Sequence, residues 1–72
     1  MITDKYLVGL ECLTSDGFTV GKIITQSDCH IETLEQENES KCHRLIFFNS
    51  LKLIKIVKEN NTEKVIIYYI NE

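Results

Sequence analysis

The chain has no apolar run of the roughly 18 to 20 residues that a membrane-spanning helix needs. It holds only three cysteines, and this odd number does not form a disulfide framework. The residues after Met1 lack the basic start and apolar stretch of a signal peptide. These absences predict a soluble protein in a reducing, cytoplasmic setting, without a membrane partner.

The chain also has no excess of basic over acidic residues. The net charge of −3 argues against a general binder of DNA or RNA. The charges are nevertheless uneven, because residues 1–40 carry two lysines against eight acids, whereas residues 41–72 carry six bases against three acids. Two interpretations remain open: a polarised surface, or solvated charges scattered around a small domain.

Motifs of known catalytic chemistry are missing. The sequence has no nucleophile elbow, no Gly-rich phosphate loop and no carboxylate pair of defined spacing. A cysteine nucleophile would need a histidine base, and neighbouring residues of a strand point to opposite faces. We therefore predict no enzyme, no catalytic residue and no cofactor.

Two Cys-His dipeptides, Cys29-His30 and Cys42-His43, supply zinc-ligand types. If a hairpin turns near residues 37–39, antiparallel pairing places the two dipeptides about five residues apart along the strands. At roughly 3.3 Å per residue, this separation far exceeds a ligand shell of about 2 Å. We expect no metal site, with the cysteines buried as small apolar residues and the histidines on the surface.

The clearest positive signal is the segment 6–24, in which an apolar run, Asp16-Gly17 and a second run follow one another. Asp-Gly between two strands predicts a two-residue hairpin turn of the mirror-image type, because glycine adopts positive φ freely and aspartate tolerates it. The first strand is expected over residues 7–14, and Gly9 marks a close approach of the backbone.

The second run, residues 18–26, changes its apolar parity. Phe18 and Val20 lie at even positions and Ile23 at an odd one. A β-bulge at Gly21 would bring all three onto one face, and isolated glycines inside strands often mark bulges.

The rest of the chain also has the pattern of short strands. Residues 29–34, 41–48 and 64–70 are predicted as strands, residues 35–40 as a loop, and Asn60-Asn61 as a turn. Residues 51–57 fit no single strand parity, so we predict a short helical turn near residues 50–55 that leads into a strand. The expected fold is all-β: one domain over residues 1–72, a small SH3-like barrel of about six short strands, with residues 1–5 frayed.

Adjacent aromatic pairs are the candidate binding residues. In Phe47-Phe48 and Tyr68-Tyr69, one member of each pair must face outward if both lie in regular strand. The competing interpretation is that these rings fill the core. The lysines at 52, 55 and 58 would contact phosphates if the partner includes RNA. The predicted partner-binding residues are Phe48, Lys52, Lys55, Tyr68 and Tyr69.

The opening half carries a recognisable order of motifs. These are Gly9-Leu10-Glu11, Asp16-Gly17 and Gly21-Lys22. In this order and spacing the chain resembles a PRC-barrel domain, most closely the C-terminal domain of the RimM family of ribosome maturation factors. Residues 45–48, 54–60 and 64–67 also resemble that family's later strands. On this resemblance, Gly9, Asp16, Gly17 and Gly21 are backbone requirements of the barrel.

The resemblance implies a non-enzymatic assembly factor. Its expected partner is the head of the small ribosomal subunit, reached through a ribosomal protein, with contact to rRNA. The chain departs from the family where Phe47 replaces a proline, and where the aromatic triplet implicated in docking is not visible at residues 2–4.

Two alternatives stay open. A divergent Sm-like scaffold would share the Asp-Gly hairpin, but that family spaces its next glycine one residue wider, and Phe48-Asn49-Ser50 stands in place of its Arg-Gly signature. A free-standing PRC-barrel interaction module, unrelated to ribosomes, is the other.

Overall fold

The computed structural model describes residues 4–71, which form a single six-stranded sheet with one 3-10 turn. The strands follow the order β4-β3-β2-β1-β6-β5 across the sheet. The all-β, barrel-like fold predicted from the sequence is confirmed. The elements are β1 (Glu11–Thr14), β2 (Thr19–Gln26), β3 (His30–Glu37), β4 (Ser40–Phe47), η1 (Phe48–Ser50), β5 (Leu51–Glu59) and β6 (Thr62–Tyr69).

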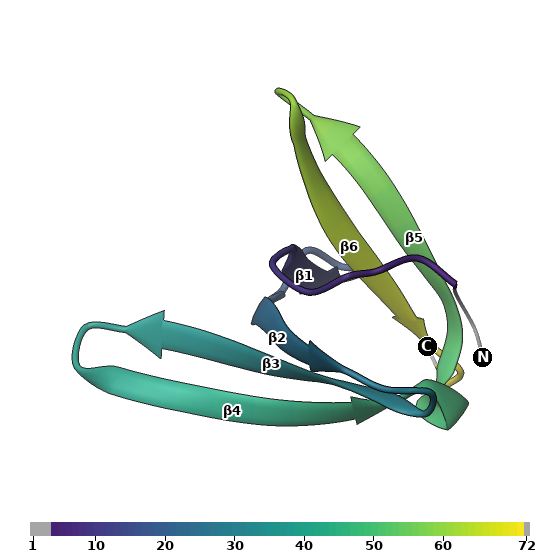
Figure 1. Cartoon of the computed structure of the whole chain (residues 1–72), viewed down its shortest axis with the longest axis horizontal. Helices are drawn as coiled ribbons and strands as arrows, with labels where there is room; N and C mark the ends of the chain where they lie inside the picture. Colours follow the sequence, from purple (N-terminus) through teal and green to yellow (C-terminus); the bar gives the residue numbers. More distant parts are fainter. Residues whose placement is uncertain (1–3, 72) are drawn as a thin grey trace.

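The short strand β1 joins the two halves of the sheet. It pairs antiparallel with β2 and parallel with β6. From this centre the long hairpins β3–β4 and β5–β6 diverge, and η1 connects them at their near ends (Figure 1). As a result, β4 and β5 are the two edges of a strongly bent sheet.

The core lies on one face of this sheet, which we call the core face; the opposite side is the outer face. In β6, Val65 and Ile67 are fully buried while Ile66 between them is half-buried, the period of two expected of a strand. The other buried apolar side chains come from the other five strands, η1 and the segment before β1: Leu7, Cys12, Val20, Ile23, Ile31, Ile46, Phe48 and Leu51.

The predicted bulge at Gly21 is confirmed. Cys12 pairs with Gly21, but the next residue of β1 pairs with Thr19, so β2 contains one extra residue. Val20 and Ile23 consequently both reach the core. The prediction is wrong for Phe18, which is 61% exposed because it precedes the first residue of β2.

The loop at Asp16-Gly17 is longer than the predicted two-residue turn. Gly17 N–H donates to the carbonyl of Thr14, and only Gly17 in this loop has positive φ (91°). This is a turn closed by a glycine bulge, the common three-residue form. Asp16 contributes through its carboxylate, which accepts a hydrogen bond from the Thr14 hydroxyl and thereby has a lowered pKa.

Two-residue turns occur instead at the tips of the long hairpins. The predicted turn at Asn60-Asn61 is confirmed, and both residues have positive φ (53° and 63°). In the other hairpin, Glu37 pairs with Ser40 around Asn38, so β3 and β4 extend into the predicted loop 35–40. Asparagine tolerates this conformation better than most residues.

The predicted helical turn exists but lies earlier, at Phe48–Ser50, and residues 51–59 form β5. The pairing of β5 with β6 shifts between Leu51 and Leu53. This irregularity breaks the strand parity in the same way as a helical spacing would, which is why the sequence pattern was ambiguous.

The segment before β1 is held in place where it is described. Residues 1–3 lie outside the described part of the chain, but the expected fraying is wrong for Lys5. Gln26 Nε2 donates to the carbonyl of Lys5 (3.0 Å), and Gln26 Oε1 accepts from Leu7 N–H (2.7 Å). Lys5 also pairs with Glu63 at 2.8 Å. Gly9 has a φ of +96° and donates its N–H to the carbonyl of Ile23. The predicted close approach at Gly9 is wrong, because nothing lies within 4 Å of its β-carbon position, and the first strand begins only at Glu11.

Candidate docking surface

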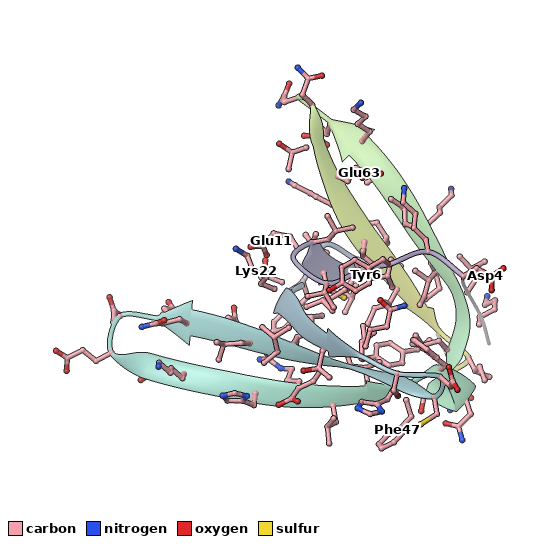
Figure 2. The ribbon with its side chains drawn as sticks, in the orientation of Figure 1. Asp4, Tyr6, Glu11, Lys22, Phe47 and Glu63 are labelled. Atoms are coloured by element: carbon pink, nitrogen blue, oxygen red, sulfur yellow. The ribbon has the colours of Figure 1, made fainter. Side chains whose placement is uncertain are left out.

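The structure does not gather the five predicted binding residues into one surface. Phe48 is the clearest correction, because it is only 7% exposed and belongs to the core. Its N–H donates to the carbonyl of Cys29 at 2.8 Å, which fixes it as the first residue of η1. The outward member of this pair is Phe47, which is 47% exposed and projects away from the β5–β6 hairpin (Figure 2).

Lys55 and Tyr68, two of the predicted residues, do share a face. Leu53 pairs with Tyr68, and Lys55 pairs with Ile66. Directly paired residues of antiparallel strands lie on the same side of a sheet. These four residues therefore form one outer-face surface, which we call the β5–β6 patch.

Tyr69 lies on the opposite side from Tyr68 and packs against the buried core. The sequence rule that one member of an adjacent pair faces outward thus holds for both aromatic pairs. The rule could not assign which member, because the direction depends on where η1 begins and on the β5 irregularity.

Lys52, the fifth predicted residue, lies at a different place. It lines a shallow, open depression at the β4–η1–β5 corner, together with Phe47 and Asn49. Asp28 and Cys29, from the turn before β3, line the other part, and Phe48 and Leu51 complete the lining.

Leu45 joins Phe47 on the outer face of β4, although it is not among the predicted binding residues. Leu45 is 58% exposed, and the Phe47 ring packs against His30 of β3 with centroids 5.6 Å apart. The signal available in the sequence was the spacing of two residues between Leu45 and Phe47, which places both on one face of a strand.

Arg44 lies on the core face of β4, and it fulfils a structural role at the Gly21 bulge. The carbonyl of Val20 accepts from Arg44 Nη1 at 2.7 Å and from the buried Thr33 hydroxyl at 3.2 Å. Arg44 also pairs with Glu35 at 2.9 Å. A bulge interrupts the regular ladder, and these two side chains satisfy the carbonyl beside it.

The burial of the three cysteines agrees with the prediction for only one of them. Cys12 is fully buried as expected, but Cys29 and Cys42 are exposed. Burial, with a smaller effect of Glu11, raises the pKa of the Cys12 thiol from its ordinary 9.0 to about 12. Cys12 therefore remains a neutral thiol at physiological pH.

Cys29 also approaches His30, contrary to the expectation for neighbours in a strand. Its Sγ lies 3.6 Å from His30 Nδ1, and Ser27 Oγ lies 2.7 Å from the same nitrogen. The contact is possible because Cys29 belongs to the turn that precedes β3, where side chains do not alternate between two faces as they do in a strand.

The two Cys-His dipeptides lie at different levels of the β3–β4 hairpin, since His30 pairs with Phe47 and His43 pairs with Leu34. His43 instead contacts Glu32 at 3.2 Å. Within residues 4–71, no group of three or more His, Cys, Asp or Glu side chains is arranged to hold a metal ion.

Comparison with protein-family models, curated proteins and solved structures finds no match to this chain. The described residues contain no helix long and apolar enough to cross a membrane.

Proposed function

We propose that this chain is a non-enzymatic binding module that docks on a macromolecular partner through the β5–β6 patch. The observation that supports this is the combination of Leu53, 39% exposed, with Tyr68 and Lys55 on one outer face. Aromatic and apolar side chains give most of the contact energy in protein interfaces, and a nearby cation directs the encounter.

The setting of this docking is proposed from the sequence resemblance. A RimM-like PRC-barrel domain would bind the head of the small ribosomal subunit in the cytoplasm, through a ribosomal protein, during assembly and rRNA processing. Lys55 is exposed within the patch and would contact an rRNA phosphate beside that protein, whereas Lys52 and Lys58 lie outside the patch.

Sedimentation with bacterial ribosomal particles tests this proposal. The chain should co-sediment with free small subunits and not with assembled ribosomes. The double variant Lys55→Glu/Tyr68→Ser should lose at least about tenfold in binding, since it removes one cation and one ring from the patch. Lys22→Glu is a suitable control, because Lys22 is an exposed lysine of β2 that lies outside the patch, beside Glu11 of β1 (Figure 2).

An even distribution of the wild-type chain at the top of the gradient would overturn the ribosomal setting. Equal binding by the patch variant and by the Lys22→Glu control would overturn the patch as the contact surface.

A second candidate is the Sm-like scaffold, which the two open edges of the sheet favour, because ring assembly could join β4 of one copy to β5 of the next. Lys41 and Arg44 are the charged residues of β4, and three lysines with one glutamate make β5 basic too. Because like charges that face each other across a ladder are destabilising, the charges of β4 and β5 oppose this ring assembly. A monomer by light scattering would exclude the scaffold, and a six- or seven-membered ring would establish it.

A further inference from the structure

The two Cys-His dipeptides of the chain differ in geometry. Cys42 belongs to β4, so its neighbour His43 lies on the opposite face of the strand, where it contacts Glu32 at 3.2 Å. Cys29 belongs to the turn before β3, and its Sγ lies 3.6 Å from His30 Nδ1. Both thiols are exposed. Of the two, the thiol of Cys29 is therefore the one that lies beside the ring of the histidine that follows it.

Ser27 forms a cluster with this thiol and this ring. Its Oγ lies 2.7 Å from His30 Nδ1 and 3.6 Å from Cys29 Sγ. The same oxygen accepts hydrogen bonds from the N–H groups of Cys29 and His30, both at 3.2 Å. Its own proton is therefore available to the imidazole or to the sulfur. We call Ser27, Cys29 and His30 the turn cluster.

Contacts with β4 and η1 hold the turn cluster in place. The carbonyl of Cys29 accepts a hydrogen bond from Phe48 N–H at 2.8 Å, and Ser27 N–H donates to the carbonyl of His30 at 2.9 Å. The ring of His30 packs against the ring of Phe47. The thiol and the imidazole therefore lie within reach of proton transfer before any ligand binds.

This arrangement suits a nucleophilic sulfur. The thiolate is the nucleophilic form of cysteine, and a histidine beside the thiol can accept its proton during attack. At Cys29 the proton moves to His30 Nδ1, and the imidazolium and the Ser27 hydroxyl then donate hydrogen bonds to the negative sulfur. A positioned base of this kind typically accelerates a reaction by about 10² to 10⁴.

Cys29 also lines the depression at the β4–η1–β5 corner. The two charged residues of that lining, Asp28 and Lys52, have opposite signs. Their charges offset one another, so the depression selects neither a purely anionic nor a purely cationic ligand. A small molecule with both an ammonium and a carboxylate group matches it, because each group is attracted by one of the two residues.

We propose that Cys29 forms reversible mixed disulfides with small amino-acid disulfides, of which cystine is the simplest. The Cys29 sulfur attacks one sulfur of the disulfide, a new S–S bond forms, and the original S–S bond breaks. The electron pair of the broken bond goes to the departing sulfur, which takes the proton from His30 Nδ1. The protein thiol is oxidised, and the departing half is reduced to a free thiol. Excess thiol reverses the step.

This inference does not rest on the proposed docking function. The turn cluster and the depression share no residue with the β5–β6 patch. A chain that fails to sediment with small subunits could still react with cystine at Cys29, and the reverse also holds.

Peptide mapping by mass spectrometry, after timed treatment of the full chain with cystine, measures the rate at each cysteine. At pH 7, Cys29 should react at least about tenfold faster than Cys42. Cys42 is the matched control, because it is also exposed and also precedes a histidine. Cys12 is fully buried and should stay unmodified in the folded chain. Equal rates at Cys29 and Cys42 would overturn the proposal.

His30→Gln distinguishes activation of the thiol from its exposure. At pH 7 this variant should slow the reaction of Cys29 at least about tenfold, because no base accepts the proton. At about pH 10 ordinary exposed thiols are ionised without a base, so the variant and the wild type should agree within about twofold. A loss that persists at this pH would be structural, and would overturn the role of His30. His43→Gln is the control and should leave the rate at Cys29 unchanged.

The double variant Asp28→Asn/Lys52→Gln tests the class of disulfide. It should slow the reaction of Cys29 with cystine at least about threefold, relative to Cys42 in the same sample. The reaction with bis(2-hydroxyethyl) disulfide, which carries no charge, should be unchanged. An equal effect on the two disulfides, or no effect on cystine, would overturn the assignment to amino-acid disulfides.

Discussion

Gly21 is the residue at which the backbone permits no side chain. Its φ is +126°, and a β-carbon placed there would lie 2.8 Å from both the carbonyl carbon and the oxygen of Leu34. Gly17 also has positive φ, but nothing lies within 4 Å of its β-carbon position. Gly17 and Gly21 are therefore required for different physical reasons.

Alanine substitutions at Gly21 and Gly17 distinguish the steric clash from the backbone strain. Gly21→Ala should lower the free energy of unfolding by about 2 to 4 kcal/mol, because it adds backbone strain and a clash with β3. Gly17→Ala adds only the backbone strain, and should cost about 1 kcal/mol. Urea unfolding measures both. Equal losses would show that the approach of Leu34 to Gly21 has no energetic weight.

Burial of Cys12 makes stability depend on pH in alkaline solution. The pKa of its thiol is raised from 9.0 to about 12, so the folded state retains a proton that the unfolded state loses. The contribution is complete below about pH 9 and is lost as the pH rises toward 12. Between about pH 8 and about pH 10 the loss should be roughly 1 kcal/mol.

Cys12→Ala should remove this part of the alkaline slope in urea unfolding. Cys42→Ala, at an exposed thiol, should retain the slope. If the two variants had the same slope, ionisation of the Cys12 thiol would not be its source.

At the scale of elements, Gln26 ties the N-terminal segment to β2. Its amide group donates to Lys5 and accepts from Leu7, whose side chain is fully buried. An isolated glutamine at the end of a strand gives no signal of such a clamp in the sequence. The predicted fraying of the segment fails at Lys5 for this reason.

Gln26→Ala should cost about 1 to 2 kcal/mol of stability, since two hydrogen bonds to backbone groups are lost. Hydrogen exchange of the Leu7 amide should become faster. Thr25→Ala, an exposed neighbour on the same strand, is the control and should change neither quantity. Unchanged exchange at Leu7 would contradict the clamp.

Irregular pairing explains both the success and the failure of the element predictions. A parity break beside a glycine indicated a bulge, and β2 has one at Gly21. The parity break over residues 51–57 predicts a helical turn near residues 50–55, but the turn lies at Phe48–Ser50 and the break is an irregularity of β5. Glycine distinguishes the two cases because it alone offers positive φ without steric cost.

For the whole molecule, the uneven charge of the sequence can be followed onto the strands of the sheet. Four glutamates of the β3–β4 hairpin lie near Lys41 and Arg44 of β4, and the residues of each open edge strand, β4 and β5, sum to +2. Like charges on the only two open edges of the described sheet oppose pairing between copies. We therefore expect a monomer.

Charge reversal on β5 tests this expectation. Lys52→Glu/Lys55→Glu/Lys58→Glu changes the net charge of β5 from +2 to −4, opposite to the +2 of β4. The triple variant should self-associate in about 0.05 M salt and dissociate in about 0.5 M salt, where charges are screened. Sedimentation velocity distinguishes these states. A monomeric triple variant in low salt would show that charge does not keep these edges apart.

The sequence by itself determined the all-β class, the bulge at Gly21, the turn at Asn60-Asn61 and the burial of Cys12. These features depend on local backbone preference and on apolar periodicity, which neighbouring residues specify. Only the tertiary structure decided that Phe47 faces outward, that β1 pairs in parallel with β6, and that β4 is left as an open edge. Such features depend on which strands, distant in the sequence, pair with each other. A local sequence pattern does not specify the strand with which a segment pairs.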